Sequence, residues 1–229
     1  MYRFIKRLFD ILASGLALVV LLPIGIIVAA GIEINDFGPV FYMASRIGKD
    51  NKAFKMFKFR SMRVVKEQAV QTLRPEEDRI FAWGRVIRRL KLDELPQLLN
   101  IFLGDMSVIG PRPVAVSQFD LFRTGKYDET KVVRPGLSGP AALYDYIYGD
   151  QFEDSDEELY REKVLPTRRE LELVYVRKQG ILFDLKMIVW TVWCILCSVF
   201  GKTPQRIYDC LVGLAKESMD TAEEQKAKI

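Results

Sequence analysis

The chain has 229 residues, with 34 Lys and Arg against 30 Asp and Glu, a formal net charge of +4, and no histidine. The absence of histidine excludes Ser-His-Asp and Cys-His catalysis, His-ligated zinc and an imidazole general base. Chemistry near neutral pH must therefore use carboxylates, Lys, Arg, Tyr, Cys or a bound metal. Hydrophobic residues make up 49% of the chain beside 28% charged residues. This composition predicts separate apolar and polar blocks, and the length allows one domain of ordinary size, or one domain plus appendages.

The first apolar block is residues 11–32, which carry no formal charge and follow a basic N-terminus. About 20 apolar residues suffice to cross a bilayer. The run is too long for the core of a signal peptide, and no small-residue cleavage site is followed by a secreted-looking sequence, so we expect residues 1–35 to be a retained membrane anchor. Pro23 and Gly25 lie near its centre and predict a bend. Both flanks are basic, which favours a re-entrant helix that bends at Pro23 and leaves on the entry face; a kinked span is the alternative.

A small β-structure is predicted after the anchor. Residues 40–42 and 54–59 have strand composition, and the second stretch alternates apolar and basic residues with period two. The loop 47–51 between them predicts a β-hairpin. Helices are expected over residues 80–90 and 98–102, so the fold class is α/β and mostly helical.

The modest net charge hides a strong asymmetry. Residues 44–92 hold fourteen basic and five acidic side chains, whereas residues 150–172 hold four basic and nine acidic ones. The basic segment predicts a surface for phosphate groups of a nucleic acid, an anionic lipid or a nucleotide. No zinc-finger spacing, RNP pattern or helix-turn-helix signal occurs, so we expect no nucleic acid partner. Three lysines close after the anchor are expected to meet lipid head groups: Lys49, Lys52 and Lys55.

Two adjacent acids, Asp93 and Glu94, directly follow the basic segment, and Pro96 marks the first turn of the next helix. A helix N-terminus favours ionised carboxylates, which suits Mg²⁺ binding or nucleophilic attack. The alternative is that the two acids only start the helix electrostatically. Arg112 lies between two prolines and Arg134 precedes Pro135. Two such rigid turns near an acidic pair suggest a phosphate clamp.

The C-terminal part offers weaker signals. Residues 187–200 form an apolar stretch of fourteen residues, too short to span, which predicts an interfacial or buried helix over about 181–200. Cys194 and Cys197 form a CxxC that lacks a second pair, and we interpret it as two small residues in that helix. Residues 214–229 are polar and predict a frayed helix or disordered tail.

Several long motifs, in this order, resemble those of the small monotopic phosphoglycosyl transferases, the bacterial sugar transferases that start glycan assembly on polyprenol phosphate. The resemblance runs from residues 6–10 to residues 182–186. It includes the anchor with Pro23 and these strings: Phe37-Gly38-Pro39-Val40-Phe41, Arg46-Ile47-Gly48, Lys58-Phe59-Arg60-Ser61-Met62, Leu92-Asp93-Glu94-Leu95-Pro96-Gln97, and residues 104–113.

The resemblance implies a re-entrant membrane helix and a compact catalytic domain, residues 36–213, on the cytoplasmic face of the bacterial inner membrane. It implies transfer of a sugar 1-phosphate from a nucleotide diphosphate sugar, usually a UDP-sugar, to undecaprenyl phosphate, with Mg²⁺ and release of UMP. Asp93 would be the nucleophile that forms a covalent phosphosugar, and Glu94 its Mg²⁺-associated partner. Asp184 would be a further acid near the metal, and the implied phosphate contacts are Lys58, Arg60, Arg88, Arg112 and Arg134.

The chain also departs from the family pattern. Leu22 precedes Pro23 where many members have Ser. After Arg134-Pro135-Gly136 many members continue with Thr-Gly-Trp-Ala-Gln and end in Asn-Gly-Arg, whereas residues 137–142 here are Leu-Ser-Gly-Pro-Ala-Ala, followed by a Tyr-rich, acidic section. The usual arginine has no counterpart, so we expect this segment to adapt the enzyme to its own sugar.

Two other functions compete with this one. A membrane-bound Mg²⁺-dependent phosphotransferase would use the same acidic pair on another lipid. A non-catalytic, membrane-anchored adaptor would use the basic face to dock lipid or protein and would not need Asp93 and Glu94 beside rigid Arg-Pro turns. Self-association into a homodimer through the apolar C-terminal helix is a further expectation.

Overall fold

A computed structural model of the chain describes residues 1–64, 79–149 and 157–227. The α-helices and strands in chain order are α1 Tyr2–Asn35, β1 Phe41–Ile47, β2 Ala53–Phe59, α2 Ala82–Arg89, α3 Gln97–Leu103, β3 Ser107–Ile109, β4 Val114–Ala115, α4 Phe119–Phe122, β5 Gly136–Ser138, α5 Pro140–Gly149, α6 Glu157–Leu159, α7 Leu165–Lys178, α8 Ile181–Val199 and α9 Gln205–Ala227. Parts of the basic segment (65–78) and of the acidic segment (150–156) lie outside the described residues.

The predicted hairpin is confirmed. β1 and β2 pair antiparallel from Phe41 opposite Phe59 to Ile47 opposite Ala53, and β4 joins the other edge of β1. Met56 packs with Leu98 and Ile101 of α3, whereas Phe59 faces the other way and packs with Val28 and Ile32 of α1. Lys58, two residues from Met56, shares the face of Met56. The helices expected near residues 80–90 and 98–102 are α2 and α3. The mostly helical α/β prediction therefore holds.

A second, two-stranded sheet pairs β3 with β5 in parallel. The strands meet at glycines: a Cβ built on Gly136 would lie 2.1 Å from the backbone nitrogen of Gly110. Only a residue without a side chain permits this close approach of two backbones. This contact places the Arg134 turn beside the chain that leads to Arg112.

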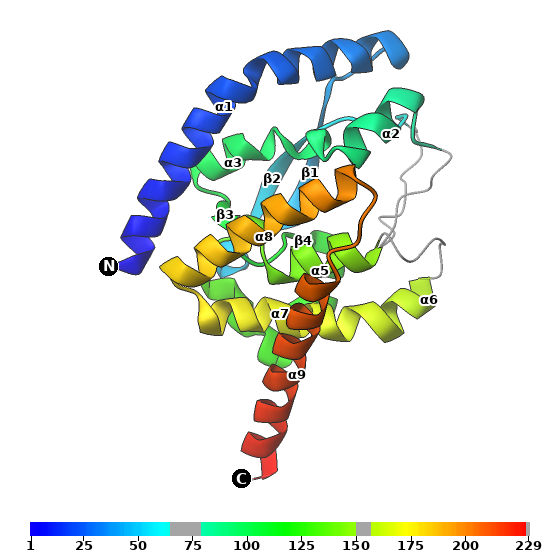
Figure 1. Ribbon diagram of the computed structural model, residues 1–229. Helices are drawn as coiled ribbons and strands as arrows, with labels where there is room; N and C mark the ends of the chain where they lie inside the picture. The colour runs from blue at the N-terminus through cyan, green and yellow to red at the C-terminus, as the bar shows by residue number, and fades with distance from the viewer. Residues whose placement is uncertain (65–78, 150–156, 228–229) are drawn as a thin grey trace.

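Helix α1 runs without interruption through Pro23 and curves along one side of the molecule (Figure 1). The carboxylate of Asp10, which is 2% exposed, fixes its first half by accepting hydrogen bonds from Ser107 Oγ and the Val108 N–H, both at 3.0 Å. Val28 and Ile32 are buried against α2. The predicted bend at Pro23 is therefore a curvature of one 34-residue helix, because the proline removes one hydrogen bond and neighbouring turns retain theirs.

Two of the described helices, α1 and α8, are long and apolar enough to cross a membrane, judged by length and composition. Most of the apolar side chains of α1 are exposed, Val19 and Leu16 among them. Helix α8 has 19 residues, longer than its fourteen-residue apolar stretch, because Asp184 and Lys186 are also helical. It buries Met187 and Cys194. Whether α1 re-enters or spans stays a prediction.

The largest core lies where α5, α7, α8 and α9 meet, and its most buried side chains include Leu171, Met187 and Leu211. Helix α9 runs from Gln205 to Ala227 and projects at the C-terminal end (Figure 1). The expected tail boundary at residue 214 falls inside this helix, and Ala215 and Ser218 are buried. A helix needs only one apolar stripe to pack, which is compatible with the polar composition of this segment.

Candidate functional site

Asp93 and Glu94 lie in a short 3₁₀ turn, Leu92–Glu94, between α2 and α3. Lys91, just before it, has a left-handed backbone with φ of 56°, which reverses the chain and turns the two acids away from α2. Asp93 is only 8% exposed. Pro96 caps α3. The acidic pair is therefore held by two helix ends and a constrained turn.

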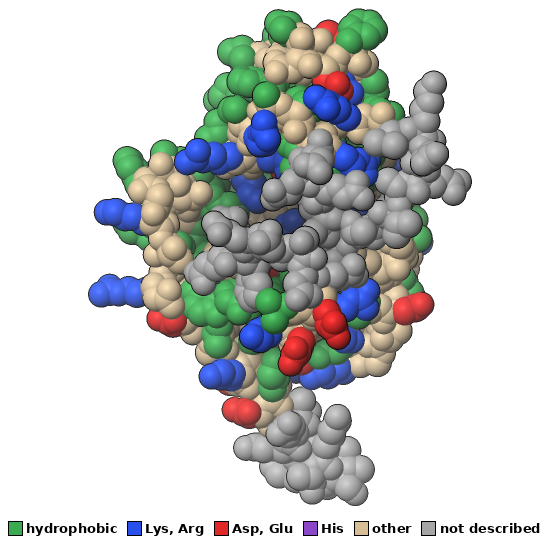
Figure 2. Space-filling model, turned by 90° about the vertical axis from the view of Figure 1, so that its right-hand side faces the viewer, with side chains coloured by type: hydrophobic (Ala, Val, Ile, Leu, Met, Phe, Trp, Pro, Cys, Tyr) green, Lys and Arg blue, Asp and Glu red, His purple; other side chains and the backbone are tan. Residues whose placement is uncertain are grey.

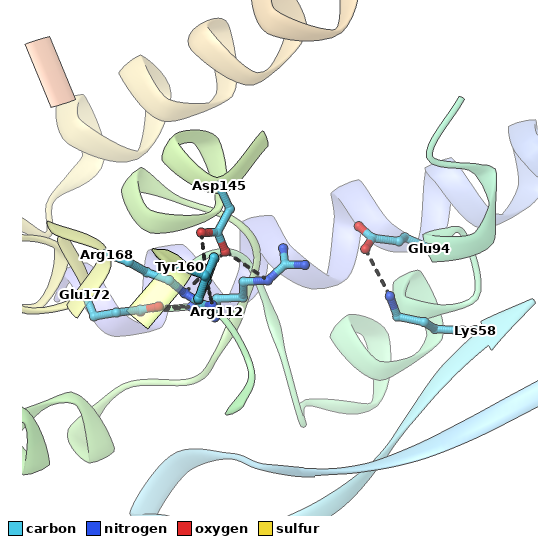
Figure 3. Close-up of polar contacts among 7 residues, drawn as sticks. All are labelled: Lys58, Glu94, Arg112, Asp145, Tyr160, Arg168 and Glu172. Atoms are coloured by element: carbon cyan, nitrogen blue, oxygen red, sulfur yellow. Dashed lines mark hydrogen bonds and ion pairs between the residues drawn. The ribbon is translucent and has the colours of Figure 1, made fainter. Parts of the chain in front are cut away.

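Lys58 reaches the acidic pair from strand β2. Its Nζ donates a hydrogen bond to Glu94 Oε1 at 3.1 Å and lies 4.0 Å from Asp93 Oδ2 (Figure 3). The two carboxylates and Lys58 are mostly buried, which strengthens their electrostatic interactions. The structure therefore brings together three residues that the sequence analysis named for the site.

The two carboxyls have different electrostatic environments. Burial raises the pKa of Asp93 above its ordinary value. The positive charge of Lys58 lowers this pKa, but by less than burial raises it, and the negative charge of Glu94 raises it further. Burial also acts to raise the pKa of Glu94, but Lys58, Arg112 and Lys91 outweigh it and lower that pKa to about 2. The sequence predicted that a helix N-terminus favours the ionised form of both acids. The ionised form of Glu94 is favoured by neighbouring cations, whereas the pKa of Asp93 is raised because desolvation is the larger effect there.

Two further cations act on Asp93. The positive charges of Arg88, in the last turn of α2, and of Lys91 favour its ionised form. On the face shown in Figure 2, Lys and Arg side chains gather around a recess in the upper half of the molecule. This arrangement can bind an anionic group and stabilise negative charge beside the acidic pair.

Arg112 approaches the same place from the opposite side. Figure 3 shows its guanidinium directed toward Glu94, while its backbone N–H donates to both carboxylate oxygens of Glu172 at 3.1 and 2.9 Å. Arg112 Nε lies 3.7 Å from Asp145 Oδ2 on α5, and Arg168 Nε on α7 lies 3.3 Å from that oxygen. The Arg-Pro turn is thus tied to α5 and α7.

Three residues of this network were not predicted from the sequence: Asp145, Arg168 and Glu172. Glu172 and Arg168 fell in a segment treated by its net charge, and Asp145 in a segment noted only for its departure from the family. One signal was present: Arg168, Glu172 and Tyr175 follow helical spacing on one face of α7, and all three are buried. Charged residues that share a buried face need partners elsewhere in the fold.

Arg60 does not join the site. It was predicted to contact phosphate, but it is 5% exposed and its guanidinium binds the carboxylate and the backbone carbonyl of Asp36. It also lies over the Phe81 ring, with 5.7 Å to the centroid. Successive side chains of a strand point to opposite faces, so Lys58 and Arg60, which are two residues apart, would share one face of a continuous strand. However, the strand ends at Phe59, and the Arg60 side chain turns toward the end of α1.

Asp184 and Arg134 also lie apart from Asp93. Asp184 Oδ2 accepts hydrogen bonds from Tyr2 and Lys6, both at 2.7 Å, and Arg134 Nε donates to the Gly104 carbonyl at the end of α3. Asp93 precedes the other end of α3, about 10 Å away along the helix axis. Arg134 lines a cavity of about 60 Å³ against the start of α1. These two residues anchor the N-terminal helix and its surroundings.

Three acids were predicted to hold Mg²⁺, and the structure places two of them, Asp93 and Glu94, side by side. In the described ranges, no three acidic or cysteine side chains come together as a metal site, and Asp184 binds Tyr2 and Lys6. Mg²⁺ is commonly held by one or two carboxylates together with substrate phosphates. The Asp93–Glu94 pair therefore fits Mg²⁺ that is shared with a diphosphate.

The sequence matches a family model described as bacterial sugar transferase over residues 1–198. A UDP-glucose:undecaprenyl-phosphate glucose-1-phosphate transferase of Escherichia coli (strain K12) is 34% identical over 83% of this chain and 40% of its own length. A UDP-N-acetylgalactosamine-undecaprenyl-phosphate N-acetylgalactosaminephosphotransferase of Aeromonas hydrophila is 35% identical over 85% of this chain and 44% of its own. The exopolysaccharide production protein PSS of Rhizobium leguminosarum bv. phaseoli is 40% identical over 61% of this chain and 73% of its own length. The chain therefore spans less than half the length of the first two relatives.

Proposed function

The chain belongs to the bacterial sugar transferase family, and we propose that it transfers a sugar 1-phosphate from a UDP-sugar to undecaprenyl phosphate and releases UMP. Two relatives are named for this reaction type, with glucose and with N-acetylgalactosamine as the sugar. The observation that carries the proposal is the buried Asp93 beside Glu94 with Lys58 between them and Arg112 opposite. This is a nucleophile and a diphosphate cradle that need no histidine.

In the proposed mechanism an Asp93 carboxylate oxygen attacks the β-phosphorus of the donor. The bond from that phosphorus to the bridging oxygen breaks, UMP leaves with the electron pair, and the sugar phosphate remains on Asp93 as an acyl phosphate. A phosphate oxygen of undecaprenyl phosphate then attacks the same phosphorus and releases the Asp93 carboxylate. Lys58 and Arg88 favour the ionised form of Asp93 and so act against the effect of burial.

The cations around the acidic pair stabilise the charge that develops on the leaving phosphate. Arg112 and Lys58 act on Glu94 from opposite sides in the structure, so a diphosphate between them would meet both. Mg²⁺, held by Asp93 and Glu94 together with the donor phosphates, would neutralise the diphosphate and assist departure of UMP. We place the reaction at the cytoplasmic face of the inner membrane, as the first membrane step of a glycan pathway, with the polyprenyl tail in the bilayer beside α1.

The test is an adduct experiment. The full chain, in membranes, is incubated with UDP-sugars in the absence of undecaprenyl phosphate. The mass of the proteolytic peptide that contains Asp93 is then measured by mass spectrometry. We expect the peptide to gain the mass of one sugar phosphate, and Asp93→Asn to lose both the adduct and UMP release. Asp105, whose carboxylate lies just after α3, provides the matched control: Asp105→Asn should retain both the adduct and UMP release. Full turnover by Asp93→Asn would refute the covalent mechanism. Absence of turnover of every donor by both the native chain and the variant would instead favour the adaptor function.

The re-entrant topology has its own test. Arg3 is exposed at the start of α1, so Arg3→Cys in a chain whose native cysteines are replaced by Ser should react with a membrane-impermeant reagent only from the cytoplasmic side. Labelling from the periplasmic side would contradict the re-entrant helix and support a span. A screen of UDP-sugars for UMP release would identify the donor sugar.

A further inference from the structure

Arg112 is supported from behind by a buried network of polar groups. Asp145 Oδ2 lies between two guanidinium groups, with Nε of Arg112 at 3.7 Å and Nε of Arg168 at 3.3 Å. Tyr160 accepts a hydrogen bond from Arg168 Nη1 at 2.5 Å and donates one to Asp145 Oδ1 at 3.4 Å. The carboxylate of Asp145 therefore has a partner on each oxygen, which fixes its orientation (Figure 3).

The inner part of this network is rigid. Arg168 is 8% exposed and its guanidinium lies over the Phe122 ring, with 4.6 Å to the centroid. Glu172, one helical turn along α7, holds the backbone of Arg112 through both of its carboxylate oxygens. Pro111 and Pro113 restrict the backbone on either side of Arg112. The side chain of Arg112 therefore leaves a fixed backbone and passes a fixed carboxylate.

The outer end of Arg112 differs from its inner end. Among the described residues, no hydrogen bond engages its two terminal Nη atoms, and its side chain is 36% exposed. Figure 3 shows these atoms directed toward Glu94, and the charge of Arg112 lowers the pKa of Glu94. The two free nitrogens thus point to where a diphosphate would lie between Arg112 and Lys58.

We propose that Asp145 is a positioning residue, which holds Arg112 in the orientation that binds the diphosphate of the donor. The proposal rests on the function proposed above. An arginine side chain loses considerable rotamer freedom when it binds an anion, so fixing its Nε in advance leaves both Nη atoms oriented for bidentate contact with phosphate. Asp145 lies on α5, in the segment that departs from the family pattern, so this support belongs to the chain's own version of the site.

A purely structural role is the competing explanation, in which Asp145 only neutralises the buried Arg168. A double-mutant cycle between Asp145→Asn and Arg112→Ala separates the two roles. The probe is UDP, and its affinity for the purified full chain in detergent is measured by calorimetry with Mg²⁺. We expect Arg112→Ala to weaken UDP binding about 100-fold and Asp145→Asn about 10-fold. The double variant should bind as Arg112→Ala does.

Glu170→Gln is the matched control. Glu170 is a buried carboxylate on the same helix, α7, that pairs with Lys126 and Tyr127 and does not contact Arg112. Its replacement should leave UDP affinity unchanged whatever it does to stability. Asp145→Glu keeps a charge for Arg168 but displaces the carboxylate by one methylene, so we expect an intermediate UDP affinity with a melting temperature close to that of the native chain.

The results can separate this inference from the proposed function. UDP affinity does not depend on turnover, so the cycle is informative even if Asp93→Asn keeps its activity. The positioning role would be overturned if the losses of UDP affinity multiplied in the double variant. It would also be overturned if the Asp145→Glu protein folded and bound UDP like Asp145→Asn or like the native chain. Absence of UDP binding by the native chain would overturn it as well, because Arg112 would then hold no diphosphate.

Discussion

Replacing Glu172 by Gln should change how the stability of the protein depends on pH. Glu172 is 5% exposed, and burial raises the pKa of its carboxyl from the ordinary 4.5 to about 7 even though Arg168, Arg123 and the Arg112 N–H act in the opposite direction. Between pH 4.5 and 7 the folded protein therefore keeps a proton on Glu172 that the unfolded chain has lost. Unfolding releases that proton, so the free energy of unfolding decreases as the pH rises through this interval.

The size of the effect follows from the two pKa values. Each pKa unit corresponds to about 1.4 kcal/mol, so the difference between 4.5 and about 7 corresponds to about 3 kcal/mol. This stability is present below pH 4.5 and lost above pH 7. For a chain of this length, 1 kcal/mol changes the melting temperature by about 2–4 °C, so about 3 kcal/mol corresponds to roughly 6–12 °C. Gln does not titrate, and it keeps an oxygen that can accept the Arg112 N–H.

The assay is the melting temperature of the native chain and of Glu172→Gln in one detergent between pH 4.5 and 8. The native chain should lose roughly 6–12 °C relative to the variant across this range. Glu170→Gln is the control, because the pKa of Glu170 is lowered and its contribution to stability is lost only below its ordinary value. A difference between native chain and Glu172→Gln that stays constant from pH 4.5 to 8 would refute the reasoning.

Three further predictions concern other parts of the structure. Lys58→Met should raise the pKa of Glu94 from about 2. Glu94 stabilises the fold above pH 4.5 and loses this effect toward pH 2, so the melting temperature of the variant should fall less than that of the native chain between pH 4.5 and 2.5. Equal decreases in the two melting temperatures would contradict the pairing. Gly31→Ala would place a Cβ 2.2 Å from Trp83 Nε1, so we expect about 1–3 kcal/mol of destabilisation in denaturant unfolding. The control is Gly213→Ala on α9, where nothing lies within 4 Å of the added Cβ, and it should be neutral or stabilising. Leu211→Ala should cost about 2–5 kcal/mol because the side chain is fully buried; a loss below 1 kcal/mol would mean that α9 does not belong to the core.

The membrane anchor, the hairpin and the helices on either side of the acidic pair could be predicted from local patterns. The apolar run around Pro23 is a property of composition, and the alternation of residues 54–59 is a property of a single strand. Asp93 and Glu94 were also found, because an acidic pair after a basic segment is unusual in a packed core, whereas Lys58 was named through the resemblance to the family. These features depend on neighbours that are close in the sequence.

The C-terminal helix shows what an average over composition leaves out. Leu211, Ala215 and Ser218 follow helical spacing on α9 and are buried, and Leu211 and Ala215 belong to the largest core. Composition averaged over residues 214–229 hides that stripe, since three or four positions in each two turns are enough to bury one side of a helix.

By itself the sequence determined the chemistry available to this protein: without histidine, the reactive groups are carboxylates and cations, and an apolar N-terminal helix lies beside them. Only the tertiary structure decided which of these groups meet. It brought Arg112 to face Glu94 with Asp145, Arg168 and Glu172 behind it, and it directed Arg60 to Asp36 and Asp184 to Tyr2 and Lys6. The physical reason is that a charged side chain several ångströms long is satisfied by whichever opposite charge the packed helices place beside it, often from 50 or more residues away.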